Sequence, residues 1–109
     1  VEQRPPPLVH YVIVRSDMPH GVQVAQTAHA AGESAGGPLP EGTVVVALAV
    51  PTEDTLRQVA IALGKESLTY KLIEENEGPF AGQACAIGVA PTTDRKAVRK
   101  ATSRLPLVK

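Results

Sequence analysis

Two runs of β-branched and aliphatic residues set the strongest constraint on how this chain can fold. Residues 9–15 read VHYVIVR and residues 43–50 read TVVVALAV, and neither run alternates between apolar and polar positions. A strand with one face in water alternates in this way, whereas a strand covered on both faces is apolar throughout. We therefore predict two strands in a sheet that has helices packed on both of its faces.

The segments that follow these runs are typical of helices. Residues 20–33 carry small apolar residues at helical spacing, and a second helix is predicted from the capping residue Thr52 to Gly64. Residues 94–104 are expected to form a last helix. The residues of the first helix expected to face the core are Val24, Ala25, Ala28 and Ala31.

Two further strands complete the pattern. Residues 67–75 alternate, and residues 83–90 are again apolar. The resulting order, β-α-β-α-β-β-α, predicts an α/β fold: a single layered domain with a four-stranded mixed sheet and helices on both faces. Residues 1–8 are rich in proline and are expected to form an extended lead, which leaves residues 9–109 as the one domain.

Composition argues against several other classes of protein. No apolar run approaches the roughly 20 residues that a membrane span needs, and no secretory signal segment is recognisable. The single cysteine, Cys85, cannot form an intramolecular disulfide, so we expect a cytoplasmic protein. His10, His20, His29 and Cys85 lack the spacing of metal ligands, and neither a metal nor another cofactor is predicted.

The net charge of zero hides a strong asymmetry along the chain. Residues 1–94 carry five basic and eleven acidic side chains, whereas residues 95–109 carry six basic side chains and no acidic one. The basic residues of the last helix are either a solvated face or a surface that binds a polyanion. Spaced as i, i+4 pairs, the candidate nucleic-acid-binding residues are Arg95, Lys96, Arg99 and Lys100.

The helix after the first strand holds the most unusual polar residue, Gln26. In open α/β sheets, ligands bind beyond the carboxyl ends of the strands, where such a helix begins. A buried glutamine needs partners for its N–H groups and its carbonyl oxygen, so Gln26 either belongs to a site or is satisfied by neighbouring backbone. The residues expected at the same edge, as candidates for substrate binding, are Arg15, Asp17, His20 and Gly21.

These segments resemble the type 2 peptidyl-tRNA hydrolases. In that family a strand ending in R-x-D precedes a helix that reads roughly G-K-x-A-A-Q-x-x-H-A, and residues 15–17 and 21–30 are similar to both. Residues 49–53 and 82–91 resemble two later segments of the family. The resemblance implies an α/β fold, peptidyl-tRNA as the substrate and partner, and a homodimer.

Three positions depart from the family. The helix lysine is Val22 here, the aspartate after the third strand is Glu75, and the loop that follows is shortened and lacks a threonine. A small eukaryotic branch, the peptidyl-tRNA hydrolase domain-containing proteins, also lacks the lysine, and this chain is more similar to that branch.

The resemblance assigns roles in the hydrolysis of an ester. Glu75 would accept a proton from water, Gln26 would donate to the carbonyl oxygen, and His29 would transfer protons, unless it is a structural residue. His20 is either a replacement cation near Val22 or an ordinary surface histidine. Two hypotheses follow: a hydrolase weakened by Val22, or a non-catalytic protein that binds tRNA or another nucleic acid.

Overall fold

The structure is a computed structural model and describes residues 6–109, so most of the predicted proline-rich lead lies outside the described residues. Its elements, in chain order, are β1 (Val9–Arg15), α1 (His20–Ala35), β2 (Val44–Val50), α2 (Glu53–Lys65), β3 (Tyr70–Glu74), the 3₁₀ helix η1 (Gly78–Phe80), β4 (Ala84–Val89) and α3 (Arg95–Thr102). Apart from η1, which lies in the predicted loop, this order confirms the prediction. Within residues 6–109 no helix is both long and apolar enough to cross a membrane.

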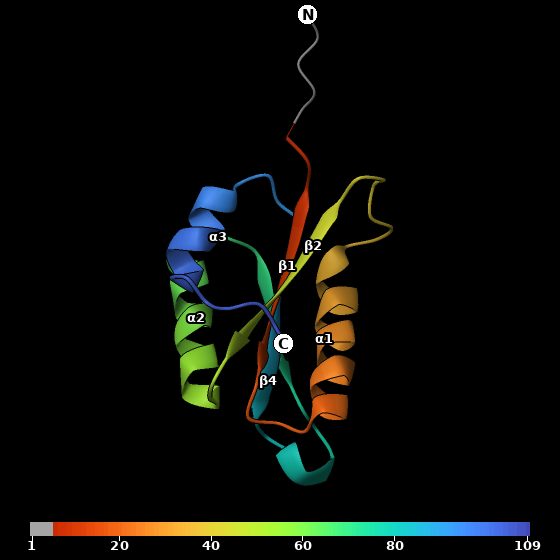
Figure 1. The fold of residues 1–109 in the computed structure, drawn as a ribbon, viewed down its shortest axis with the longest axis vertical. Helices are drawn as coiled ribbons and strands as arrows, with labels where there is room; N and C mark the ends of the chain where they lie inside the picture. Colours follow the sequence, from red (N-terminus) through yellow and green to blue (C-terminus); the bar gives the residue numbers. More distant parts are fainter. Residues whose placement is uncertain (1–5) are drawn as a thin grey trace, which may run out of the picture.

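The four strands form one mixed sheet in the order β2-β1-β4-β3. β1 pairs in parallel with β2, and β4 runs antiparallel to both β1 and β3. β1, β2 and β3 therefore point the same way, and their carboxyl ends meet at one edge of the sheet. This carboxyl edge is the lower end of the molecule in Figure 1.

Helices cover both faces of the sheet, as predicted (Figure 1). All seven residues of β1 are buried, and alternate side chains enter two separate cores. Tyr11 and Ile13 join the core under α2 and α3, whereas Val12 and Val14 join the core under α1. The position of β1 inside the sheet explains why its sequence is apolar without alternation.

The prediction that residues 43–50 form a strand covered on both faces is wrong for the first half of β2. This strand lies at the edge of the sheet, where Val44 is 43% exposed and Val45 is 59% exposed. Residues 48–50 are buried. A run of valines fits a pleated strand anywhere in a sheet, so its composition does not reveal whether a second neighbour is present.

The end of the chain covers the buried half of this edge. The N–H of Ala49 donates to the carbonyl of Pro106 at 2.8 Å, and the N–H of Val108 donates to the carbonyl of Ala47 at 3.0 Å. The chain end thus satisfies β2 backbone groups that would otherwise face solvent.

The predicted core face of α1 is wrong for Val24, Ala25 and Ala28, which are exposed, and holds only for Ala31, which packs partly buried against the core. The buried residues of α1 are Gln26, Ala30 and Ser34, which follow one another at i, i+4 spacing. Val24, by contrast, is 57% exposed. The helix is too uniformly small and apolar for its sequence to identify the face that packs on the sheet.

A close contact between α1 and β4 decides this orientation. A Cβ atom at Gly88 would collide with the Ser34 side chain and with the carbonyl of Ala30. The Ser34 hydroxyl donates to that carbonyl at 2.7 Å and lies 2.7 Å from Nε2 of His10 on β1. Burial lowers the pKa of His10, so its ring is neutral at pH 7 and ties α1 to the sheet without charge.

Helix ends follow the expected capping chemistry. Thr52 caps α2 as predicted, because its hydroxyl accepts the N–H of Thr55 at 3.2 Å. Asp94 caps α3 by accepting the N–H of Ala97 at 3.1 Å. The first helix extends two residues beyond the predicted end, to Ala35, and the last one ends at Thr102.

Candidate active site

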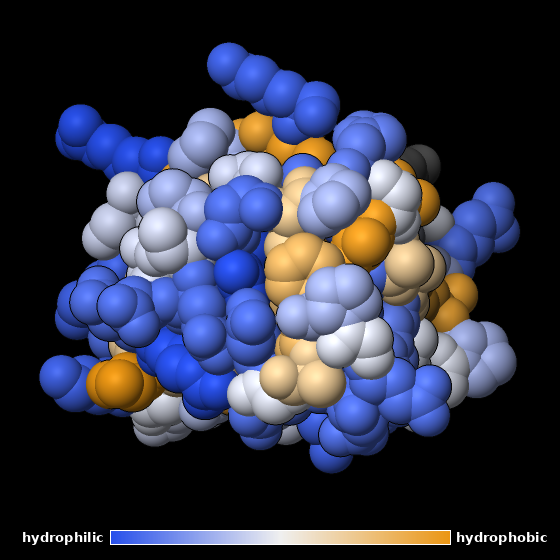
Figure 2. All heavy atoms as spheres, turned by 90° about the horizontal axis from the view of Figure 1, so that it is seen from below, coloured by the Kyte–Doolittle hydropathy of each residue, from blue (hydrophilic) through white to orange (hydrophobic). Residues whose placement is uncertain are grey.

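Most of the predicted site residues lie at the carboxyl edge of the sheet. β1 ends there with Arg15, β3 ends just before Glu75, and α1 begins there with His20 and Gly21. Figure 2 views the molecule from this edge and shows a mainly hydrophilic surface with a hydrophobic band near its middle. The fold therefore brings polar side chains from three elements to the edge where α/β proteins bind ligands.

Gln26 and Glu75 are in direct contact. Nε2 of Gln26 donates to Oε2 of Glu75 at 2.6 Å. The other carboxylate oxygen accepts the backbone N–H groups of Asn76 at 3.0 Å and Glu77 at 3.3 Å. The hydrogen bond from Gln26, followed by those two N–H groups, lowers the pKa of Glu75. The carboxylate is therefore ionised at neutral pH and held in a fixed orientation.

The carbonyl oxygen of Gln26 is the unusual atom of this pair. The side chain is only 7% exposed, and Oε1 finds no hydrogen-bond partner within residues 6–109. The amide cannot be reversed, because its oxygen would then face the carboxylate of Glu75. Leaving a buried acceptor unsatisfied costs about 1–3 kcal/mol. The pair thus combines an anchored carboxylate with a buried acceptor that no group within residues 6–109 satisfies.

Arg15 is engaged with the protein itself. Its Nε and Nη2 donate to the two carboxylate oxygens of Asp17, both at 2.9 Å. Its Nη1 donates to Oε1 of Gln83 at 2.8 Å and to the carbonyl of Ala84 at 3.2 Å. Arg15 is 6% exposed, and its hydrogen bond lowers the pKa of Asp17. This pair fixes the loops at the carboxyl edge and leaves little donor capacity for a substrate.

The other predicted residues of α1 face solvent. Nε2 of His29 lies 3.4 Å from Glu33, with each side chain about half exposed. No hydrogen bond within residues 6–109 joins His29 to Gln26 or Glu75, although His29 is the smallest of the groups that lower the pKa of Glu75. His20 and Gly21 are exposed at the start of the helix. The structure therefore brings Gln26 to Glu75 and Arg15 to Asp17 but keeps His29 outside both pairs.

Val22 lies one helical turn before Gln26, on the side of α1 that faces the sheet. It is partly buried and packs against the core that contains Val14 and Met18. A side chain at this position therefore lies next to the Gln26 side chain along the helix. Methyl groups stand here where the resembled family has a cation.

Glu53, at the start of α2, is a residue of this edge that the sequence did not identify. Its Oε2 accepts the N–H of Ala84 at 2.8 Å and pairs with Arg57 at 3.1 Å. The N–H of Ala84 is the main cause of its lowered pKa, followed by Arg57. An acidic residue in the first turn of a helix is explained by its favourable interaction with the helix dipole. The sequence around Glu53 therefore gives no sign of its hydrogen bond to β4.

The basic residues of α3 lie away from this pair. α1 covers one face of the sheet, and α3 lies with α2 on the opposite face (Figure 1). The candidate nucleic-acid-binding residues Arg95, Lys96, Arg99 and Lys100 are thus separated from Gln26 and Glu75 by the sheet. In the part of the chain that the structure describes, no three histidine, cysteine or acidic residues cluster to hold a metal.

A scan against known protein-family models and a search of curated proteins each found no match to this chain.

Proposed function

We propose that this chain is a weak ester hydrolase of the peptidyl-tRNA hydrolase kind, with Gln26 and Glu75 at its centre. The observation that carries the proposal is the buried Gln26 amide, which donates to Glu75 and keeps its own oxygen free. A glutamine placed only for packing would have that oxygen satisfied. The resemblance in residues 15–30 supplies the substrate class, an ester between a peptide and the ribose of tRNA.

In this proposal Glu75 is the base. Its ionised carboxylate accepts a proton from a water molecule whose oxygen attacks the ester carbonyl carbon. The ester C–O bond then breaks, and the products are a peptide carboxylate and a ribose hydroxyl, which receives a proton. Gln26 holds Glu75 in place through Nε2, while its Oε1 stays buried without a partner within residues 6–109. One N–H of Nε2 is engaged by Glu75, and the second N–H is left for the expected role of Gln26 as donor to the carbonyl oxygen.

Two features of the site support a slow reaction. The hydrogen bonds to Glu75 lower its pKa and make it a weaker base. Val22 offers no charge one turn before Gln26, where a cation would stabilise the developing oxyanion. Both features reduce the rate without removing the groups that orient water and substrate.

Cleavage of peptidyl-tRNA by three variants tests this proposal. We expect slow release of tRNA by the unmodified chain and a loss of about 100-fold in Glu75→Gln, because a general base contributes at least that much. Gln26→Ala should also lose most of the activity. Glu77→Gln makes the same chemical change at an exposed position two residues away and should keep full activity. Cleavage that both site variants leave unchanged would place the chemistry elsewhere.

A second candidate, a non-catalytic nucleic-acid-binding protein, is favoured by the charge of the chain end. Residues 95–109 have six basic side chains and no acidic one. Lys96 is exposed on α3, and Lys100 is exposed apart from a 3.5 Å pair with Glu66. Titration of tRNA at several salt concentrations tests this function. Replacing both lysines by glutamine should make the dependence of the tRNA binding constant on salt less steep, by nearly one unit of logarithmic slope for each lost phosphate contact. An unchanged slope would show that these lysines do not contact the phosphates.

A further inference from the structure

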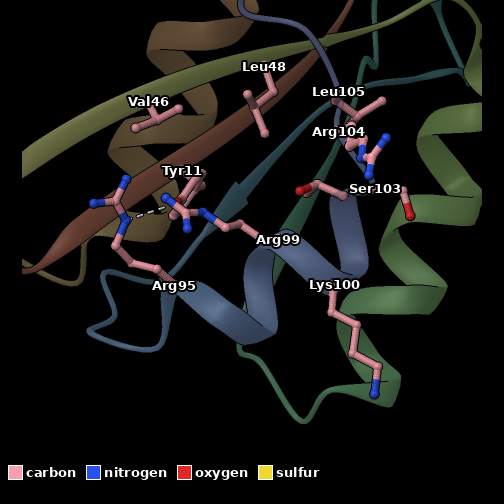
Figure 3. Close-up of a pocket in the computed structure, with 10 residues that line it drawn as sticks. Tyr11, Val46, Leu48, Arg95, Arg99, Lys100, Ser103, Arg104 and Leu105 are labelled. Carbon is pink, nitrogen blue, oxygen red and sulfur yellow. Dashed lines mark hydrogen bonds between the residues drawn. The ribbon is translucent and has the colours of Figure 1, made fainter.

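A cleft of about 630 Å³ opens on the face of the sheet opposite α1 (Figure 3). It lies between β1, β2, α3 and the residues that follow α3. The residues that line it are Tyr11, Val46, Leu48, Arg95, Arg99, Lys100, Thr102, Ser103, Arg104 and Leu105. Its volume is within the range of small-molecule binding sites, about 300–1,000 Å³.

One side of the cleft is apolar and the other is cationic. Val46, Leu48 and Leu105 supply aliphatic surface. Figure 3 shows Arg95 and Arg99 extending from α3 toward Tyr11, and Nε of Arg95 donates to the Tyr11 hydroxyl at 3.4 Å.

The structure divides the four basic residues predicted on α3 into two groups. Arg95 and Arg99 are directed into the cleft (Figure 3). Lys100 also lines the cleft, but its side chain extends away from Tyr11 (Figure 3) and pairs with Glu66, whereas Lys96 is not among the lining residues. Of the four, Lys96 therefore lies outside the cleft, and Lys100 lines it while pairing with a carboxylate.

The arginines of the cleft have no carboxylate to neutralise them. No acidic residue lines the cleft, and no ion pair within residues 6–109 involves Arg95, Arg99 or Arg104. Arg95 also stands in the first turn of α3, where the helix dipole disfavours a cation. Uncompensated guanidinium groups beside apolar surface attract an anion more strongly than the same groups in open water.

The backbone after α3 is strained at the rim of the cleft. Ser103 and Arg104 both have positive φ angles, 43° and 64°, which residues other than glycine rarely adopt. The N–H of Ser103 bonds to the carbonyl of Arg99 at 3.0 Å and helps hold this turn. Strain of this kind tends to occur where a side chain is held in a functional position, and here it sets Arg104 at the cleft.

We propose that this cleft binds a small organic phosphate with an aliphatic body. The phosphate would lie against Arg95, Arg99 and Arg104, whose planar donor groups match phosphate oxygens. The aliphatic part would lie on Val46 and Leu48. Single-stranded nucleic acid fits less well, because the one aromatic residue of the cleft, Tyr11, is only 4% exposed and offers no open ring face for a base. The site is separate from the proposed hydrolytic site, since the sheet lies between them.

Calorimetric titration of the full chain with hexyl phosphate, inorganic phosphate and hexanol tests the proposal. We expect hexyl phosphate to bind at least about tenfold more tightly than inorganic phosphate, because its alkyl chain adds apolar burial. Arg99→Gln should weaken that binding by about tenfold or more. Val46→Thr, which is isosteric, should reduce the preference for hexyl phosphate while leaving the affinity for inorganic phosphate unchanged.

Lys96→Gln is the matched control, because it removes the same charge from the same helix outside the cleft. It should change the affinity for hexyl phosphate by less than about twofold, as expected for a screened surface charge. Equal losses in Lys96→Gln and Arg99→Gln would mean general attraction to a basic surface and overturn the proposal. Equal affinities for hexyl phosphate and inorganic phosphate would also overturn it. So would tRNA binding that is lost in Arg99→Gln but is not competed by hexyl phosphate. If Arg99→Gln does not fold, Arg95→Gln and Val46→Thr decide the result.

Discussion

The side chain of Gln26, in the middle of α1, donates a 2.6 Å hydrogen bond to the carboxylate of Glu75, which follows β3. The two residues are 49 positions apart, and the bond ties a helix on one face of the sheet to the end of its edge strand. It is also the main cause of the lowered pKa of Glu75. The pair therefore links the position of a helix to the ionisation of the proposed base.

Replacing Gln26 by alanine should raise the pKa of Glu75 toward the ordinary value of a glutamate. The lowered pKa in the folded chain means that Glu75 stabilises the fold above its unfolded pKa, and that this contribution is lost as the pH falls through the folded pKa. Carboxyl ¹³C NMR titration measures the shift directly, and Gln58→Ala on the exposed side of α2 is the control. An unchanged titration of Glu75 in Gln26→Ala would contradict the hydrogen bond.

Replacing Arg15 by alanine should destabilise the fold by about 1–3 kcal/mol, because a buried guanidinium is removed and its acceptors lose their donor. The change leaves Gln83 and the carbonyl of Ala84 without a donor, and it leaves Asp17 without its counter-ion. Arg57→Ala breaks an exposed pair and should cost less than about 1 kcal/mol. Urea denaturation compares the two variants, and equal losses would show that burial does not set the strength of these pairs.

Replacing Gly88 by alanine should destabilise the protein by about 1–3 kcal/mol, because the new methyl group meets Ser34 and Ala30 of α1. Gly32→Ala makes the same change within α1, where the added Cβ meets no atom within 4 Å. Since alanine favours a helix over glycine, that variant should gain about 0.5–1 kcal/mol. Thermal denaturation of both proteins checks the opposite signs, and a stabilised Gly88→Ala would refute the close packing of α1 on β4.

The helices and strands could be predicted from the sequence, but the position of β2 in the sheet and the packed face of α1 could not. The run at residues 9–15 is apolar because β1 is inside the sheet, and the cap at Thr52 depends on a local bond. The edge position of β2 depends on which strands pair across the chain. The packed face of α1 depends on Gly88, a residue of β4 that no pattern within α1 contains.

In the candidate site, too, single residues could be recognised from their own segment, whereas contacts between distant segments could not. Gln26 is conspicuous in the sequence because an amide inside an alanine-rich helix needs partners. Its contact with Glu75 and the contact of Arg15 with Gln83 join distant segments, and the spacing of residues does not specify them. The basic residues of α3 form one group in the sequence, whereas in the structure Arg95, Arg99 and Lys100 line the cleft and Lys96 does not.

Replacing Val22 by lysine should increase the cleavage of peptidyl-tRNA by about tenfold or more. A well-placed donor near a developing oxyanion contributes about 100- to 1,000-fold, and recovery is expected to be partial because Glu75 and the short loop after it still differ from the resembled family. The lysine stem can lie along the apolar surface beside Met18 while its ammonium group reaches water near Gln26. Val24→Lys adds the same charge two residues along the helix at a position that is 57% exposed, and it should leave the rate unchanged. Equal acceleration in both variants would mean that the added charge acts by attracting RNA, and no acceleration in Val22→Lys would show that position 22 does not face the reacting ester.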